Sequence, residues 1–143
     1  MPYDVSQLLK MTSAQLDDCF KSGAPGPIPN GEAKGTAIVA PGTVFTKETA
    51  AFISIFTWQG KTFDAQAGVL RNRISVFGIS AIVAKVYQGA SWFDNKECVV
   101  LDYSETSMVA HWVRDEIRLI SPGLYLGLVY WKKDRLIHFA LEF

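Results

Sequence analysis

Residues suited to acid-base chemistry are concentrated in the segment 101–118. If Arg114 faced a cavity, its guanidinium could bind the carboxylate or enolate of a substrate. Asp102, Tyr103 and Glu116 could then transfer a proton to or from that substrate. On a solvent-facing surface the same residues would form cross-strand ion pairs, each contributing roughly a few tenths of a kcal/mol. The segment therefore predicts either a catalytic site or a charged outer surface.

Side-chain alternation divides this segment into two faces. On a strand, Asp115 and Ile117 share one face, whereas Arg114, Glu116 and Arg118 share the other. Arg118 is thus a second candidate anchor and Asp115 a second candidate acid or base. The sequence does not show which face points inward, so both interpretations stay open.

The two histidines could serve different chemistries. His138 alternates with Leu136 and Glu142 in the last apolar run, so inside a cavity it would be another proton-transfer residue. His111 or His138 could also be the proximal ligand of a haem, although a single histidine on a strand is more often a structural hydrogen-bonding group. We expect no cofactor, with haem as the alternative, and the scarcity of histidine predicts no metal site.

Aromatic residues form the second group with functional potential. The chain contains 18 Phe, Tyr and Trp residues, which is more apolar bulk than a small barrel interior needs. Gly123 and Gly127 alternate with Tyr125, and glycines at such positions permit curvature or leave space for a ligand. The alternative is a filled core with a homodimer contact at Tyr130 and Trp131. The predicted ligand-binding residues are Trp58, Trp112, Tyr125, Phe139 and Arg71.

Composition excludes several functions. The chain of 143 residues has 14 basic and 14 acidic residues, so it lacks the excess positive charge typical of nucleic-acid-binding proteins. No apolar run approaches the roughly 18 residues of a membrane-spanning helix. The N-terminal segment carries acids where a signal peptide would be basic, and Cys19 and Cys98 lack the spacing of metal ligands. We expect a soluble cytoplasmic protein with no nucleic-acid partner and no membrane span.

The N-terminal part is predicted to contain two short helices. Thr12 and Gln15 have the spacing of a capping box, which favours a helix over 13–21. Residues 46–57 have apolar residues near helical spacing and are expected to form a second helix. The segment 22–35 is rich in proline and glycine and is predicted to be an irregular wrapping loop.

The remaining chain is predicted to be β structure. Apolar or alternating runs, separated by turn residues, cover 69–77, 80–88, 96–103, 107–120, 123–131 and 135–142. Consecutive antiparallel strands that must protect their edges favour a barrel or half-barrel; a curved sheet wrapped around a helix is the competing architecture. We expect one domain over 1–143, in which the helical segment 1–57 packs on an antiparallel β-barrel formed by 58–143.

One motif resembles a bacterial family named for a Gly-x-Trp-x-Gly sequence. Trp58-Gln-Gly-Lys-Thr-Phe-Asp and the following Val69-Leu-Arg-Asn are similar to a segment of that family, as is the helix with Phe20 followed by Pro29-Asn-Gly. The chain lacks the Gly-x-Trp-x-Gly sequence, and Phe20 stands in the corresponding region. The resemblance implies a small calycin- or lipocalin-like barrel, and the family itself has no assigned function.

These observations predict a protein that binds a hydrophobic or amphipathic small molecule inside a β-barrel. A cofactor-free isomerase, cyclase or lyase on the same scaffold is the alternative, with Arg114 as substrate anchor and the nearby acids, Tyr103 or His138 as proton-transfer groups. A structural or interaction protein with a filled barrel is a third possibility.

Overall fold

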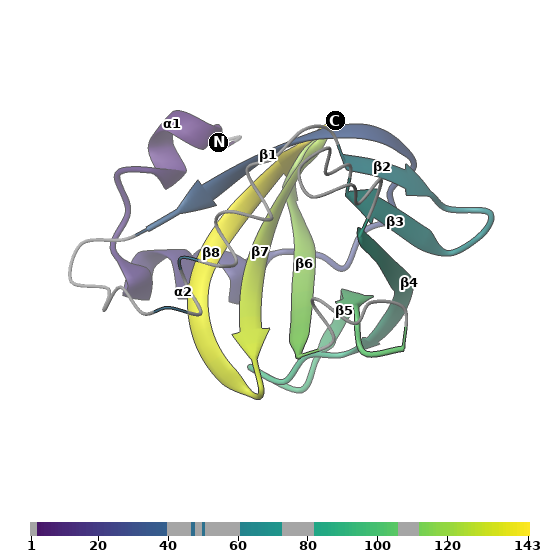
Figure 1. The fold of residues 1–143 in the computed structure, drawn as a ribbon. Helices are drawn as coiled ribbons and strands as arrows, with labels where there is room; N and C mark the ends of the chain where they lie inside the picture. The colour runs from purple at the N-terminus through teal and green to yellow at the C-terminus, as the bar shows by residue number, and fades with distance from the viewer. Residues whose placement is uncertain (1–2, 40–46, 48–49, 51–60, 73–81, 106–111) are drawn as a thin grey trace.

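The computed structural model describes residues 3–39, 47, 50, 61–72, 82–105 and 112–143. Within these residues, eight strands form a closed antiparallel barrel in which each strand pairs with the next and β8 pairs with β1 (Figure 1). The prediction of a mainly β fold with an antiparallel barrel is confirmed. The strands are β1 (Gly31–Ile38), β2 (Lys61–Asp64), β3 (Val69–Asn72), β4 (Ile82–Ala90), β5 (Glu97–Asp102), β6 (Val113–Ser121), β7 (Leu124–Trp131) and β8 (Asp134–Glu142).

Two short helices precede the barrel, α1 (Val5–Leu8) and α2 (Ser13–Ser22). Thr12 and Gln15 form the predicted capping box of α2, which confirms the helix expected over 13–21. A second capping box, formed by Asp4 and Gln7, begins α1, a helix that was not predicted. The helix expected over 46–57 lies outside the described residues, apart from positions 47 and 50. In the described part of the chain, neither helix is long and apolar enough to cross a membrane.

The prediction of an irregular loop over 22–35 is wrong from residue 31 onward. Gly31 begins β1 with a φ of 97°, a conformation that glycine adopts without strain. The strand then pairs with β2 on one side and β8 on the other. Hydrogen bonding along both edges outweighs the low strand propensity of this segment.

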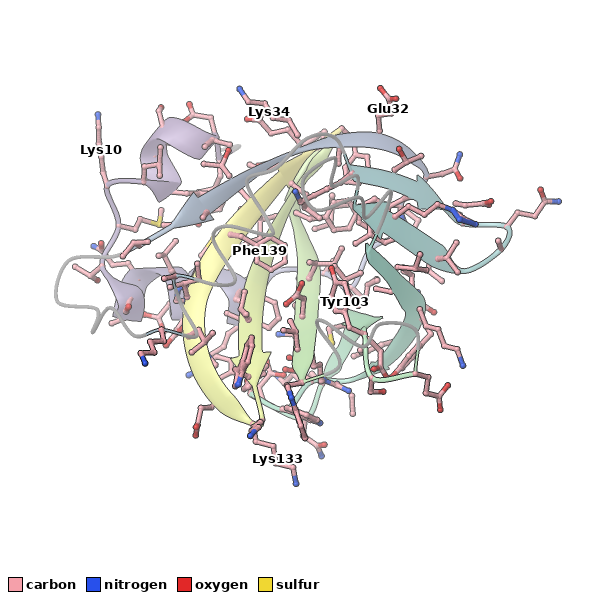
Figure 2. The ribbon with its side chains drawn as sticks, in the orientation of Figure 1. Lys10, Glu32, Lys34, Tyr103, Lys133 and Phe139 are labelled. Atoms are coloured by element: carbon pink, nitrogen blue, oxygen red, sulfur yellow. The ribbon has the colours of Figure 1, made fainter. Side chains whose placement is uncertain are left out.

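The barrel wall separates two apolar clusters. The inner cluster comprises Ala33, Phe63, Leu70, Ala84, Val86, Val99, Leu101, Tyr103, Val113, Ile117, Tyr125, Val129, Ile137, Phe139 and Leu141. The outer cluster lies beneath α1, α2 and the loop 91–96, and comprises Leu8, Leu16, Cys19, Phe20, Ile38, Cys98, Val100, Leu124, Leu126, Leu128, Tyr130 and Ala140. In Figure 2, Tyr103 and Phe139 lie within the ring of strands. The orientation left open by the sequence is thus fixed: Phe139 points inward and His138 outward.

β7 and β8 form a hairpin closed by a two-residue turn. Lys132 and Lys133 connect β7 to β8, with φ values of 52° and 77°. Two positive φ angles are the pattern of a type I′ turn, in which asparagine and glycine are preferred. A side chain in this conformation costs on the order of 1 kcal/mol relative to glycine. The turn therefore carries strain at two lysines.

Candidate ligand site inside the barrel

The central polar group of the barrel interior is Asp115 on β6. It lies between Val113 and Ile117, both members of the inner cluster, and its side chain is completely buried. Neither carboxyl oxygen has a hydrogen-bond partner among the described residues. Burial raises the pKa of Asp115 well above its ordinary value, although the positive charge of Lys61 acts in the opposite direction. The interior thus contains a carboxyl group to which the described residues donate no hydrogen bond.

Lys61 provides the opposing charge. It is the first residue of β2, two positions before the inward-facing Phe63, and 3% of its surface is exposed. Burial lowers the pKa of Lys61 to about 8, while the negative charge of Asp115 acts to raise it. In both residues, burial favours the uncharged form. Lys61 and Asp115 therefore form an acid-base pair within an apolar and aromatic interior.

Three of the sequence-predicted residues lie in the same interior: Tyr103, Tyr125 and Phe139. The hydroxyl of Tyr125 donates a hydrogen bond to the carbonyl oxygen of Pro27 at 2.7 Å. The ring of Phe139 lies directly over Gly127, where an added Cβ would be 2.2 Å from the ring. The space expected at Gly127 is thus occupied by Phe139 and is not open to a ligand.

Arg114 and Glu116 lie on the outer face of β6 and bind the loop that follows β4. Glu116 is buried and accepts hydrogen bonds from the Ser91 hydroxyl at 2.5 Å and the Trp92 backbone N–H at 2.7 Å. Arg114 donates to Glu116 at 3.2 Å and to the carbonyl oxygen of Ala90 at 2.9 Å. Both residues were predicted to share a cavity with Tyr103, but strand alternation separates them from it.

His138 also lies outside the barrel, beneath α2. Its Nε2 is 2.8 Å from a carboxylate oxygen of Asp17, which also accepts from Arg135 at 2.6 Å. Burial lowers the pKa of His138, and the charge of Arg135 adds to this effect, whereas Asp17 opposes it. These contacts attach α2 to β8. His138 therefore has a structural role outside the barrel and does not occupy the predicted position in the cavity.

The other predicted site residues are also separated from the interior. Asp102, on the outer face of β5, accepts a hydrogen bond from Tyr87 at 2.9 Å and also binds Ser104. Arg71 is exposed on the face of β3 opposite to the inward-facing Leu70. Trp112 is exposed, with the Lys132 ammonium 4.4 Å from its ring centre.

Two further predicted residues, Trp58 and His111, lie outside the described residues. Tyr130, assigned to a possible dimer contact, is buried in the outer cluster.

The sequence indicated Asp115 only as an alternative, and Lys61 was not singled out. The available signal for Lys61 was its alternation with Phe63 in a short run that was not assigned as a strand. Arg118, the second candidate anchor, is instead buried on the outer face and bound to Asp94. Among the residues that the structure describes, no three His, Cys, Asp or Glu side chains are placed to hold a metal ion.

Comparison with known proteins adds evidence on the fold. No family model matches the chain, and no curated protein matches it. A crystal structure of a protein from Thermomonospora curvata is similar, with a TM-score of 0.66 and 15% sequence identity, over 93% of this chain and 88% of that one. At this identity the likeness shows the fold alone, and it agrees with a calycin-like barrel. The resemblance to the Gly-x-Trp-x-Gly family stays a prediction.

Proposed function

We propose that the barrel interior binds a small, largely apolar molecule through one polar group that contacts Asp115. The observation that carries this proposal is the complete burial of Asp115 without a hydrogen-bond partner among the described residues. A buried polar group left unsatisfied costs about 1–3 kcal/mol. A ligand that donates a hydrogen bond to this carboxyl group would recover that free energy, and the inner cluster would contact its apolar part.

A purely structural ion pair is the main alternative role for Asp115. A buried carboxylate retained for stability normally has excellent geometry and additional hydrogen bonds to both oxygens. Asp94 in the loop 91–96, whose side chain is 12% exposed, comes closer to this description, because each of its oxygens accepts a hydrogen bond from one guanidinium. Asp115 does not meet it, which favours an external partner.

The second candidate is a cofactor-free isomerase, cyclase or lyase. It is supported by the opposite shifts of the Asp115 and Lys61 pKa values, because a carboxylic acid and an amine with perturbed pKa values in one interior can exchange protons with a substrate. Of the predicted catalytic set, all of which the structure describes, Tyr103 alone belongs to the inner cluster. In this alternative, Asp115 and Lys61 replace Arg114, Glu116 and His138 as the reacting groups.

The experiment is a fluorescence titration with N-phenyl-1-naphthylamine, a neutral apolar probe with one N–H donor. We expect the probe to bind the wild-type protein and to bind Asp115→Leu about tenfold more weakly, since one hydrogen bond contributes up to about 1.5 kcal/mol. Arg71→Gln is the control, because it changes a polar residue exposed on the outer surface. Equal or tighter binding by Asp115→Leu would contradict the proposed role of Asp115.

Native mass spectrometry complements this titration. A bound molecule that co-purifies with the wild-type protein should be lost on denaturation and should be depleted in Asp115→Leu but retained in Arg71→Gln. A co-purified molecule retained equally by both variants would show that Asp115 does not hold it.

A further inference from the structure

A groove lies on the outside of the barrel, between the loop 91–96 and the β7–β8 hairpin. It has a volume of about 300 Å³, and Trp92, Tyr130 and Lys133 line it. This volume lies at the lower end of the range for small-molecule sites. These three lining residues are not members of the inner cluster, so the groove is separate from the proposed interior site.

The aromatic wall of the groove is held in place. The rings of Trp92 and Tyr130 are 5.2 Å apart and meet edge to face at 72°. The backbone N–H of Trp92 is bound to the buried Glu116, and the Arg114 guanidinium lies 4.3 Å from the indole centre. Even so, 48% of Trp92 is exposed. A rigid, half-exposed indole offers a surface for a flat apolar ring.

Positive charge surrounds this wall. In the strand register Tyr130 stands between Arg114 on β6 and Arg135 on β8, and Lys133 lies at the tip of the hairpin (Figure 2).

Two of the three nearby acids already have partners. Glu116 binds Ser91, Trp92 and Arg114, and Asp17 is shared by Arg135 and His138. Asp134, at the base of the hairpin, is exposed to solvent. The environment therefore favours an anion.

The hairpin turn gives independent support. Lys132 and Lys133 occupy positions with positive φ, where asparagine and glycine fit without strain. The strain places a lysine side chain at the groove, and backbone strain retained in a fold is often associated with function.

We infer that this groove binds a small planar aromatic carboxylate. The ring would lie against the exposed part of Trp92 beside Tyr130, and the carboxylate would accept a hydrogen bond from the ammonium of Lys133. The inference is independent of the interior site, because it uses the outer face of the barrel only.

The test is titration of the ¹⁵N-labelled protein with 2-naphthoate, following the indole N–H signal of Trp92, assigned by its loss in Trp92→Phe. We expect saturable shifts of this signal and none with the neutral 2-naphthalenemethanol. Lys133→Gly should weaken 2-naphthoate binding about tenfold. The same variant should raise the midpoint of urea unfolding, because glycine relieves the strain at φ 77°.

Two control variants separate the groove from the rest of the surface and from the barrel interior. Lys34→Gln removes an exposed lysine from β1, at the opposite end of the view in Figure 2, and should leave the affinity for 2-naphthoate unchanged. Asp115→Leu should also leave it unchanged, so the groove and the interior site can fail separately. Unchanged affinity in Lys133→Gly, or equal binding of the neutral analogue, would overturn the inference.

Discussion

Two buried residues of β6, three positions apart, have opposite relations to the rest of the protein. Arg118 points outward, and its guanidinium makes five hydrogen bonds to Asp94, Phe20, Lys96 and Glu97. Asp115 points inward, and its two oxygens have no hydrogen-bond partner among the described residues. Both side chains are almost completely buried. The two side chains therefore differ in their hydrogen-bond partners and not in their burial.

This contrast separates polar groups that maintain the fold from polar groups that the fold does not require. A buried charge with all its partners stabilises the particular arrangement of the elements that provide them. A buried carboxyl group without a hydrogen-bond partner lowers stability, so its presence points to a ligand or a reaction. Substitutions on the two faces of β6 test whether they differ in this way.

The largest effect is expected from the outer face. Arg118→Met should lower the free energy of unfolding by about 3–5 kcal/mol, because it leaves Asp94 without its bidentate partner and removes hydrogen bonds that join α2 and the loop 91–96 to β6. Urea denaturation measures this change. Arg71→Met, at an exposed position, should alter stability by less than about 0.5 kcal/mol. A similar loss of stability in both variants would show that the hydrogen-bonded Arg118 contributes no more to stability than an exposed arginine.

Inside the barrel, we expect substitution of the polar groups to raise the free energy of unfolding and not to lower it. Replacing both polar groups, in Asp115→Leu with Lys61→Met, should raise the free energy of unfolding by about 1–4 kcal/mol, as seen when buried ion pairs are exchanged for apolar residues of similar size. The measurement is urea denaturation without ligand. A large loss of stability would show that the pair supports the fold, as Arg118 and Asp94 do.

A third substitution tests how tightly the interior is filled. Gly127→Ala should destabilise the protein by about 1–3 kcal/mol, because the new methyl group would overlap the ring of Phe139. Thermal unfolding measures the loss. Phe139→Leu in the same chain should recover part of it by removing the overlapping ring. If Phe139→Leu recovers no stability, the overlap with the Phe139 ring is not the cause of the loss.

The smallest effect is a difference in pH dependence. Arg118 lowers the pKa of Asp94 to about 2, so its contribution to stability is present above about pH 4 and is lost as the pH falls toward 2. Asp115 has a raised pKa in the folded state, so stability falls as the pH rises above about 4.

Each contribution is at most about 1.4 kcal/mol per pH unit. Urea titrations at several pH values should show that Asp94→Asn removes the loss of stability at acid pH. Asp115→Asn should remove the fall in stability as the pH rises above about 4. The same change of slope in both variants would contradict the assignment.

The barrel could be predicted because most of its strands are apolar runs between clear turns. Two strands were not recognised in full: β1 begins in a glycine-containing segment, and β2 has only four residues. Both depend on pairing with strands distant in sequence, such as β8 with β1. Local propensity contains little information about such pairing.

The orientation of the site could not be predicted because both faces of β6 and β7 are largely buried. In β7, Tyr125 and Val129 belong to the inner cluster, while Leu126 and Leu128 belong to the outer cluster beneath the helices. Alternation of apolar and polar residues, which normally marks the inner face, is therefore absent from this strand. Asp115 and Glu116 could not be distinguished, although one lies inside and the other outside.

Closure of the barrel has a consequence for how the protein folds. The strands from β5 to β8 follow one another along the chain, and β7 and β8 are joined by a two-residue turn. The pairing of β1 with β8, which closes the barrel, instead places Ile38 opposite His138, 100 residues later in the chain. Loop-closure entropy makes such contacts slow to form, which is typical of proteins that fold in milliseconds to seconds. The edges of β1 and β8 therefore remain open until late in folding, when an open edge can pair with another chain.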